Sequence, residues 1–373
     1  MESTYFNTYE DWESKYGAKG YFFHRVDLHT GLKELAQRPG SNPGFRPAKI
    51  RLSSEVADID CEAGIIKLAD GDTFHKDLVV IADGVHSGFV YKISNDISPA
   101  SRIGQSIFRF LVPTEKLRAH PVTAAIFPES EPSGIHVAVL GNRRMVWYPC
   151  RNGTLQNCAM IHADERYSAG VEDWHAGASK EDLLNTYKAF HPALVELCNQ
   201  ADDIRLWPLL FRRPNATWTK GRAILIGDAA HPMLPHQGQG GAQGLEDGAA
   251  LGVLLSHIPA VASAPNPNDD ILASSESESE SESSESSAAR ADLDAVIAER
   301  LHLFQEIRKN RTAAVQIFSN AGQDEAAKIE RDAKPFVNGK VPTNPDEFHD
   351  YSFGYDVVED CLMALKRLQD AKG

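Results

Sequence analysis

The sequence contains no long apolar run and no excess of positive charge. No stretch approaches the roughly 18 consecutive apolar residues of a membrane-spanning helix, and the acidic, aromatic amino terminus lacks the apolar centre of a secretory signal. Lysine and arginine number 38 against 52 acidic residues, which gives a net charge of −14. This balance argues against nucleic acid or an anionic membrane surface as the main partner.

Cysteine is also scarce, and its spacing excludes two classes of site. The cysteines are odd in number and form no C-x-x-C pair, which argues against a disulfide framework and a cysteine-based metal site. They are Cys61, Cys150, Cys158, Cys198 and Cys361. Reduced thiols are typical of an intracellular protein, so we expect a cytoplasmic location, no membrane span and no metal.

Two short apolar runs each end in an acidic residue next to a glycine. Residues 223–226 are too short for a helix and predict a buried strand, which Gly227-Asp228 follows at once. Residues 78–81 predict a second buried strand, followed by Asp83-Gly84. Ligands of open α/β sheets bind at the carboxyl ends of strands, so we expect Asp228 to face a ligand.

A glycine-rich loop and helix come next. Gly238, Gly240 and Gly241 allow backbone N–H groups to approach a bulky ligand closely. Glycines then recur every four residues from 240 to 252 and would form a strip without side chains on one face of a helix. Each costs roughly 0.5–1 kcal/mol relative to alanine. Two interpretations stay open, a flat ligand against the strip or a poor helix packed closely on a sheet.

This stretch resembles the second FAD-binding motif of the flavoprotein aromatic hydroxylases, the salicylate-hydroxylase-like monooxygenases. The match runs through Gly227-Asp228, Ala229-Ala230-His231-Pro232, Pro235-His236-Gln237-Gly238-Gln239-Gly240 and Glu246-Asp247. The resemblance implies that Asp228 holds a ribityl hydroxyl of FAD and that Pro232 lies by the reactive edge of the flavin. It also implies that the glycine loop faces the pyrimidine end of the ring.

Two earlier segments extend the resemblance. The segment from His24 to His29 is similar to a family segment whose arginine reaches the flavin, which assigns Arg25 to cofactor binding. Asp83-Gly84 resembles the family motif that contacts the cofactor pyrophosphate and helps the nicotinamide donor, although Gly88 stands where the family has an arginine after Ser87. Without the resemblance, an arginine before a helix is usually only solvated.

Alternating and aromatic runs from about 100 to 165 predict an antiparallel sheet, the substrate domain that the resemblance implies. Arg109 lies in an apolar strand, and Tyr148 begins a predicted turn. Both fit ordinary structural roles, but the family places an arginine and a tyrosine near substrate at comparable positions. Arg109, Tyr148 and His236 are therefore the candidates for binding or polarising the substrate oxygen. The sequence assigns no general base.

One family feature is missing. No G-x-G-x-x-G fingerprint of the kind that cradles the ADP half of FAD precedes Arg25. We therefore expect the chain to align with the family from Tyr21 to about Phe318 and to lack the amino-terminal βαβ segment. On that expectation, this chain alone binds FAD weakly or not at all and is poorly soluble, and an added fingerprint segment restores both properties.

We predict a mixed α/β protein with an incomplete Rossmann-like FAD-binding domain and an antiparallel-sheet substrate domain. The expected boundaries are residues 1–98 and 206–330 for the FAD-binding domain, 99–205 for the substrate domain and 331–373 for a tail. A Ser/Glu tract at 273–288 is expected to be a disordered insertion that can be deleted without loss of fold.

The predicted function is that of an FAD-dependent monooxygenase. By resemblance, NADH or NADPH reduces the flavin, and O2 supplies the oxygen atom that hydroxylates a small aromatic substrate. The rival prediction is a non-catalytic or truncated homologue that keeps only a binding or scaffold role. The absent fingerprint favours the rival, and the intact loop at 227–244 favours the enzyme.

Overall fold

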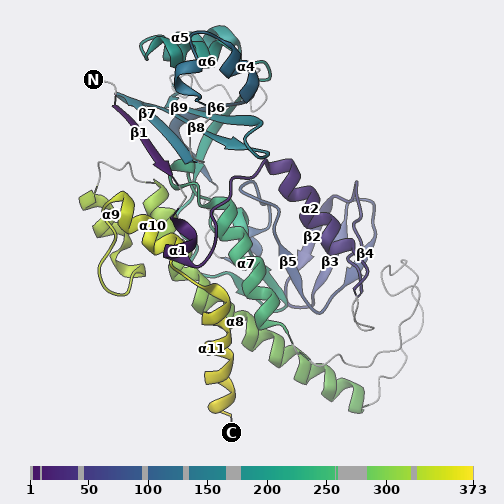
Figure 1. Ribbon diagram of the computed structural model, residues 1–373. Helices are drawn as coiled ribbons and strands as arrows, with labels where there is room; N and C mark the ends of the chain where they lie inside the picture. The colour runs from purple at the N-terminus through teal and green to yellow at the C-terminus, as the bar shows by residue number, and fades with distance from the viewer. Residues whose placement is uncertain are drawn as a thin grey trace. The chain divides into compact units, whose positions relative to one another are not determined.

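The chain forms two compact units, each built from two separate stretches of sequence (Figure 1). The computed structural model describes residues 3–8, 11–40, 46–94, 100–128, 134–164, 178–256, 258, 284–320 and 326–372. Unit 1 comprises Met1–Ile50 and Arg102–Leu209, and unit 2 comprises Arg51–Ser101 and Leu210–Gly373. The first fifty residues, which we expected in the cofactor domain, thus group with the large sheet.

Unit 1 is organised around a six-stranded sheet. Its strand order is β1 (Ser3–Thr8), β7 (Gly134–Leu140), β8 (Arg143–Cys150), β9 (Leu155–Ala163), β6 (Ser101–Pro113) and β10 (Arg205–Phe211). The pairs from β1 to β6 are antiparallel, as the alternating runs predict. Tyr148 lies within β8 rather than in a turn, because the strand continues to Cys150 before the chain reverses.

Helices cover one face of this sheet. Phe108 and Phe110 alternate with Arg109 on β6, and their buried rings pack with Leu183 and Leu197 in one apolar cluster. The covering elements are α4 (Thr114–Ala119), α5 (Lys180–Tyr187) and α6 (Pro192–Asn199), which Figure 1 shows gathered together on that side. The 3-10 helix η1 (Ala124–Ile126) replaces a strand expected near residue 125.

The amino-terminal part of unit 1 contains α1 (Trp12–Tyr16) and α2 (Arg25–Gln37). Residues 21–23, an aromatic run of the kind found in strands, lie outside the strands of the described structure. An aromatic run forms a strand only with a partner, and here Phe22 stacks on Tyr148 with ring centroids 4.8 Å apart. His24 is the N-cap of α2, and Asp27 accepts two hydrogen bonds from the Arg151 guanidinium at 2.6 and 2.5 Å.

Unit 2 contains two small sheets. One is the antiparallel set β2 (Val56–Asp60), β3 (Ile65–Leu68) and β4 (Thr73–His75). The other has the order β11 (Thr219–Lys220), β12 (Ala223–Leu225) and β5 (Val79–Ile81). β12 and β5 are the two predicted buried strands, and they pair in parallel with Ala223 opposite Val79.

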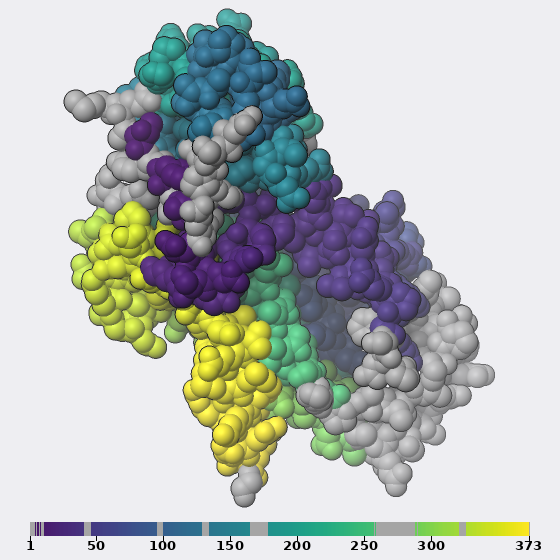
Figure 2. Space-filling model, in the orientation of Figure 1, coloured from purple at the N-terminus to yellow at the C-terminus, as the bar shows by residue number. Residues whose placement is uncertain are grey.

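The rest of unit 2 is mainly helical. Its helices are α3 (Val90–Ile93), α7 (Gly240–Leu254), α8 (Ser284–Asn320), α9 (Ala326–Ala333), α10 (Pro345–Phe353) and α11 (Val357–Asp370), with the 3-10 helices η3 (Gly227–Ala229), η4 (Pro235–Gln237) and η5 (Lys334–Phe336). α11 packs along α7, and its yellow surface lies beside the green surface of α7 in Figure 2. The carboxyl-terminal segment is therefore a folded part of unit 2.

The structure describes only the carboxyl-terminal end of the Ser/Glu tract that was predicted to be disordered. Residues 273–283 lie outside the described residues, whereas 284–288 belong to the first turns of α8, so the prediction is wrong for those five. The mixed fold class is confirmed. The described helices include none long and apolar enough to cross a membrane, and the five cysteines are buried and unpaired.

Candidate functional site

The carboxyl ends of β5 and β12 bring two predicted motifs to one edge of the sheet. Because the strands are parallel and in register, Asp83-Gly84 and Gly227-Asp228 leave them on the same side. Gly84 has φ +89° and Gly227 has φ +56°, left-handed conformations that favour glycine. Local sequence thus placed both acid–glycine pairs correctly.

Asp228 is exposed at this edge. A Cβ built on Gly240, the first residue of α7, would lie 4.0 Å from Asp228 Oδ1, so the carboxylate stands against the amino end of that helix. Arg212 Nη2 donates to the Asp228 carbonyl at 3.3 Å. Surrounding protein atoms raise the pKa of Asp228, while His231 and Arg212 act in the opposite direction. A carboxylate acceptor thus stands beside the first turn of a helix, where the backbone N–H groups have no partner within the helix.

The loop between Asp228 and α7 is held by its backbone. Pro232 is buried, and its carbonyl accepts from Gln316 Nε2 at 2.7 Å. His236 lies in η4, which ends at Gly238 with φ +64°. The backbone therefore favours glycine at position 238.

The last three glycines of the strip on α7 are uncovered by the described part of the chain. A Cβ built on Gly244, Gly248 or Gly252 would meet no described atom within 4 Å, whereas one built on Gly240 would lie 3.7 Å from the Met233 side chain. The interpretation of a helix packed closely on a sheet is therefore wrong at Gly244, Gly248 and Gly252. Their ligand role stays a prediction.

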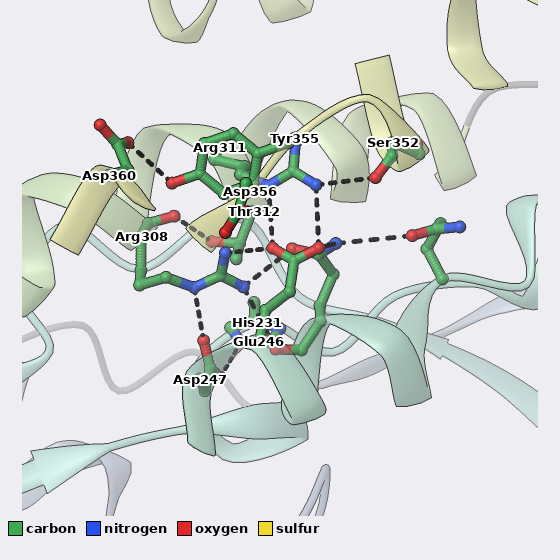
Figure 3. A network of polar contacts seen from close by, with 12 residues as sticks. His231, Glu246, Asp247, Arg308, Arg311, Thr312, Ser352, Tyr355, Asp356 and Asp360 are labelled. Carbon is green, nitrogen blue, oxygen red and sulfur yellow. Dashed lines mark hydrogen bonds and ion pairs between the residues drawn. The ribbon is translucent and has the colours of Figure 1, made fainter. Parts of the chain in front are cut away.

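A buried polar network holds the loop through hydrogen bonds (Figure 3). Asp247, fully buried on α7, accepts through Oδ2 from the Gly227 N–H at 2.9 Å and from His231 Nε2 at 2.6 Å. Its Oδ1 accepts from Nε of Arg308, a fully buried residue of α8, at 2.9 Å. Arg308 also pairs with Glu246 and donates to both oxygens of Gln243. Two helices thus anchor the backbone on which Asp228 sits.

The charges of this network are matched. Burial alone would raise the pKa of Asp247, but the hydrogen bond from His231 and the charge of Arg308 outweigh it, and the pKa is lowered. Burial likewise opposes ionisation of Glu246, and its bonds with Arg311 and Arg308 lower its pKa. Both carboxylates are therefore ionised at neutral pH.

The remaining candidates lie in unit 1. Arg109 stands opposite Ala159 on β9, and Tyr148 stands opposite Asn157. Ala159 and Asn157 lie two residues apart on β9 and therefore face the same side of the sheet, as do the residues opposite them. Arg109 and Tyr148 thus point to the same face, away from Phe108. Burial raises the pKa of Tyr148, and the nearby charge of Arg109 works against that rise. The phenol is therefore protonated at neutral pH.

Arg25 is the exposed first residue of α2, in unit 1. The Asp27–Arg151 pair ties this first turn to the hairpin between β8 and β9. The position of Arg25 is therefore set by the sheet that carries Tyr148.

Comparison with known proteins identifies the family. The sequence matches the profile of the FAD binding domain over residues 45–263. It is 36% identical to the FAD-dependent monooxygenase cfoG of Aspergillus candidus, over 94% of this chain and 74% of that protein. It is also 36% identical to hispidin-3-hydroxylase of Neonothopanus nambi, over 67% of this chain and 61% of that protein. The chain belongs to the FAD-dependent monooxygenases.

The fold agrees with this family. A salicylate hydroxylase substrate complex superposes with a TM-score of 0.62 at 22% identity, over 91% of this chain and 75% of that chain. The predictions of an FAD-dependent monooxygenase and of an oxidoreductase are confirmed.

Sequence reasoning missed the network as a functional element of this monooxygenase. Glu246-Asp247 was noted only as part of a motif, and Arg308 and Arg311 were given no role. The available signal was an acidic pair on a glycine-rich helix together with Arg308 and Arg311 on an apolar one. Charges on otherwise apolar helix faces are almost never fully buried unless they are paired.

Proposed function

We propose that this monooxygenase binds FAD at the carboxyl ends of β5 and β12 and uses it to hydroxylate a small aromatic substrate. The observation that carries the proposal is the exposed Asp228 carboxylate, held beside the amino end of α7 by a backbone anchored at Gly227. A polyol hydroxyl needs such an acceptor, and a phosphate or ring carbonyl needs free N–H groups. The residues present therefore fit a flavin nucleotide.

Each candidate has a distinct task in this proposal. Asp228 accepts from a ribityl hydroxyl, and Gly227, Gly238, Gly240 and Gly241 let backbone N–H groups reach the cofactor. Pro232 lies by the reactive edge of the ring. Arg25 reaches the flavin cofactor, and Asp83-Gly84 contacts its pyrophosphate. NADH or NADPH is the electron donor, and the protein is cytoplasmic.

FAD, when bound, supplies the redox chemistry with O2, and the protein orients the substrate. Arg109 provides a fixed positive charge for an anionic substrate oxygen, and Tyr148 provides a protonated phenol that donates a hydrogen bond. His236, in η4, is the third candidate for polarising that oxygen. The hispidin-3-hydroxylase relative supports a phenolic substrate.

Turnover with defined reactants tests the function. We expect the purified chain supplied with FAD to oxidise NADH or NADPH and to add one labelled oxygen atom from isotopic O2 to a phenolic acid such as salicylate or to hispidin. Mass spectrometry of the product measures the result. Saturating FAD without oxygen incorporation across such a panel would favour the scaffold role instead.

Removal of the polar groups on the substrate face should impair hydroxylation but not flavin binding. We expect Arg109→Ala to lower kcat/KM by about 10- to 100-fold and Tyr148→Phe by about tenfold, the usual cost of a lost hydrogen bond to a charged or polar group. Product formation and FAD titration measure the two properties. Arg205→Ala, which removes an exposed arginine of the same sheet paired with Asp203, is the control. Loss of FAD binding in either test variant would contradict the assignment.

A further inference from the structure

The polar network continues past the cofactor loop to the carboxyl-terminal helices. Arg311, one turn beyond Arg308 on α8, is 7% exposed and binds both oxygens of Glu246 at 2.9 Å. The same guanidinium donates to the carbonyls of Tyr351 and Ser352, each at 2.9 Å. These carbonyls lie in the last turn of α10, where helical carbonyls have no intrahelical donor.

An aromatic ring fixes the guanidinium from the other side. The Tyr355 ring centroid lies 3.9 Å from the guanidinium carbon of Arg311, within the range of a cation–π contact. Tyr355 in turn donates its hydroxyl proton to Asp360 of α11 at 2.8 Å. Figure 3 shows Tyr355 and Ser352 on the α10–α11 side of Arg311 and Glu246 below it.

These contacts form one unbroken path. It runs from the end of α10 through Arg311 to Glu246, through Arg308 to Asp247, and from Asp247 to the backbone N–H of Gly227. The region that matches the FAD-binding profile ends at residue 263, before Arg311 and Tyr355. Coupling through a chain of buried, fully hydrogen-bonded charges is a physical route by which one element biases another.

We propose that Arg311 is a positioning residue, through which α10 and α11 hold the Gly227–His231 loop in its binding conformation. The effect on FAD rests on the proposed function, whereas the effect on the loop does not. When Arg311 is removed, Glu246 keeps only Arg308 as an arginine partner and moves closer to it. Arg308 then shifts away from Asp247, and the hydrogen bond from the Gly227 N–H to Asp247 weakens.

Hydrogen exchange and FAD titration test the proposal together. In Arg311→Ala we expect the amides of Gly227 and His231 to exchange faster in the FAD-free protein, and the dissociation constant of FAD to rise by roughly 5- to 150-fold. The matched control is Arg331→Ala, which removes an exposed arginine of unit 2 whose partner is Asp332. It should leave both quantities unchanged.

A second variant, Tyr355→Leu, tests the proposal if Arg311→Ala does not fold. Tyr355→Leu removes the ring but leaves every hydrogen bond of Arg311, so the same two changes should appear with smaller size. Tyr355→Phe keeps the ring and loses only the hydrogen bond to Asp360, so we expect both changes to be smaller than in Tyr355→Leu.

Three results would overturn the proposal: unchanged loop exchange, faster exchange spread evenly over unit 2, or faster loop exchange with unchanged FAD affinity. If the unmodified chain binds no FAD at any concentration, the proposed function fails. In that case, hydrogen exchange in the Gly227–His231 loop is the only test of whether α10 and α11 hold the loop.

Discussion

Asp228→Ala is expected to raise the dissociation constant of FAD by about 10- to 100-fold, the cost of losing a charged acceptor from a bound hydroxyl. The backbone of the loop should persist in this variant, because Gly227 and His231 are held by Asp247 and not by Asp228. Flavin fluorescence during titration measures affinity, and the melting temperature of the FAD-free protein checks the fold.

Two further variants sharpen this test. Asp228→Asn keeps one carbonyl acceptor without the charge, so its affinity should fall between those of the unmodified chain and the alanine variant. Asp332→Ala removes an exposed carboxylate elsewhere in unit 2 and should change nothing. Equal FAD binding by the unmodified and Asp228→Ala proteins would remove Asp228 from the cofactor site.

Arg308→Ala is expected to destabilise the protein by about 3–5 kcal/mol, because it leaves buried carboxylates without their positively charged partner. Arg308 is fully buried and contacts Asp247, Glu246 and Gln243. Denaturant unfolding measures the difference in free energy, and Arg331→Ala again serves as the exposed control. A change no larger than that of the control would show that the network contributes nothing to stability.

Arg308→Ala should also change how the free energy of unfolding depends on pH under acidic conditions. Glu246 and Asp247 have ordinary pKa values of 4.5 and 3.8 and are lowered in the folded protein. Their contribution is thus fully present above about pH 4.5 and is lost as the pH falls through the lowered values. Without Arg308 the pKa values return towards or above their ordinary values. We expect a flatter or reversed dependence between pH 5 and pH 3 in unfolding experiments.

Local patterns predicted the strand and the helix of the proposed cofactor site, but not the network that supports them. Strand β12 and helix α7 follow from short-range signals, an apolar run and helical spacing. The pairing of β12 with β5 was suggested only by the repeated acid–glycine ending. The network could not be read in this way, because Arg308 lies 61 residues from Asp247 in sequence and only tertiary packing brings them together.

The errors have a common physical origin. Residues 21–23 have the aromatic composition of a strand, but Phe22 stacks on the ring of Tyr148. Residues 284–288 lack apolar side chains but continue a helix whose later turns are packed in the core. In both cases contacts outside the local window decided the conformation.

The interleaved order of the two units constrains how the chain folds as it is synthesised. β5 emerges early, but its parallel partner β12 follows 144 residues later, since Ala223 pairs with Val79. The intervening stretch from Arg102 to Leu209 belongs to unit 1 and can complete that unit first. Until β12, α7 and α11 leave the ribosome, the early strands of unit 2 carry unpaired edges that invite association with other chains. Nascent chains paused before residue 223 are therefore the species that most need a chaperone.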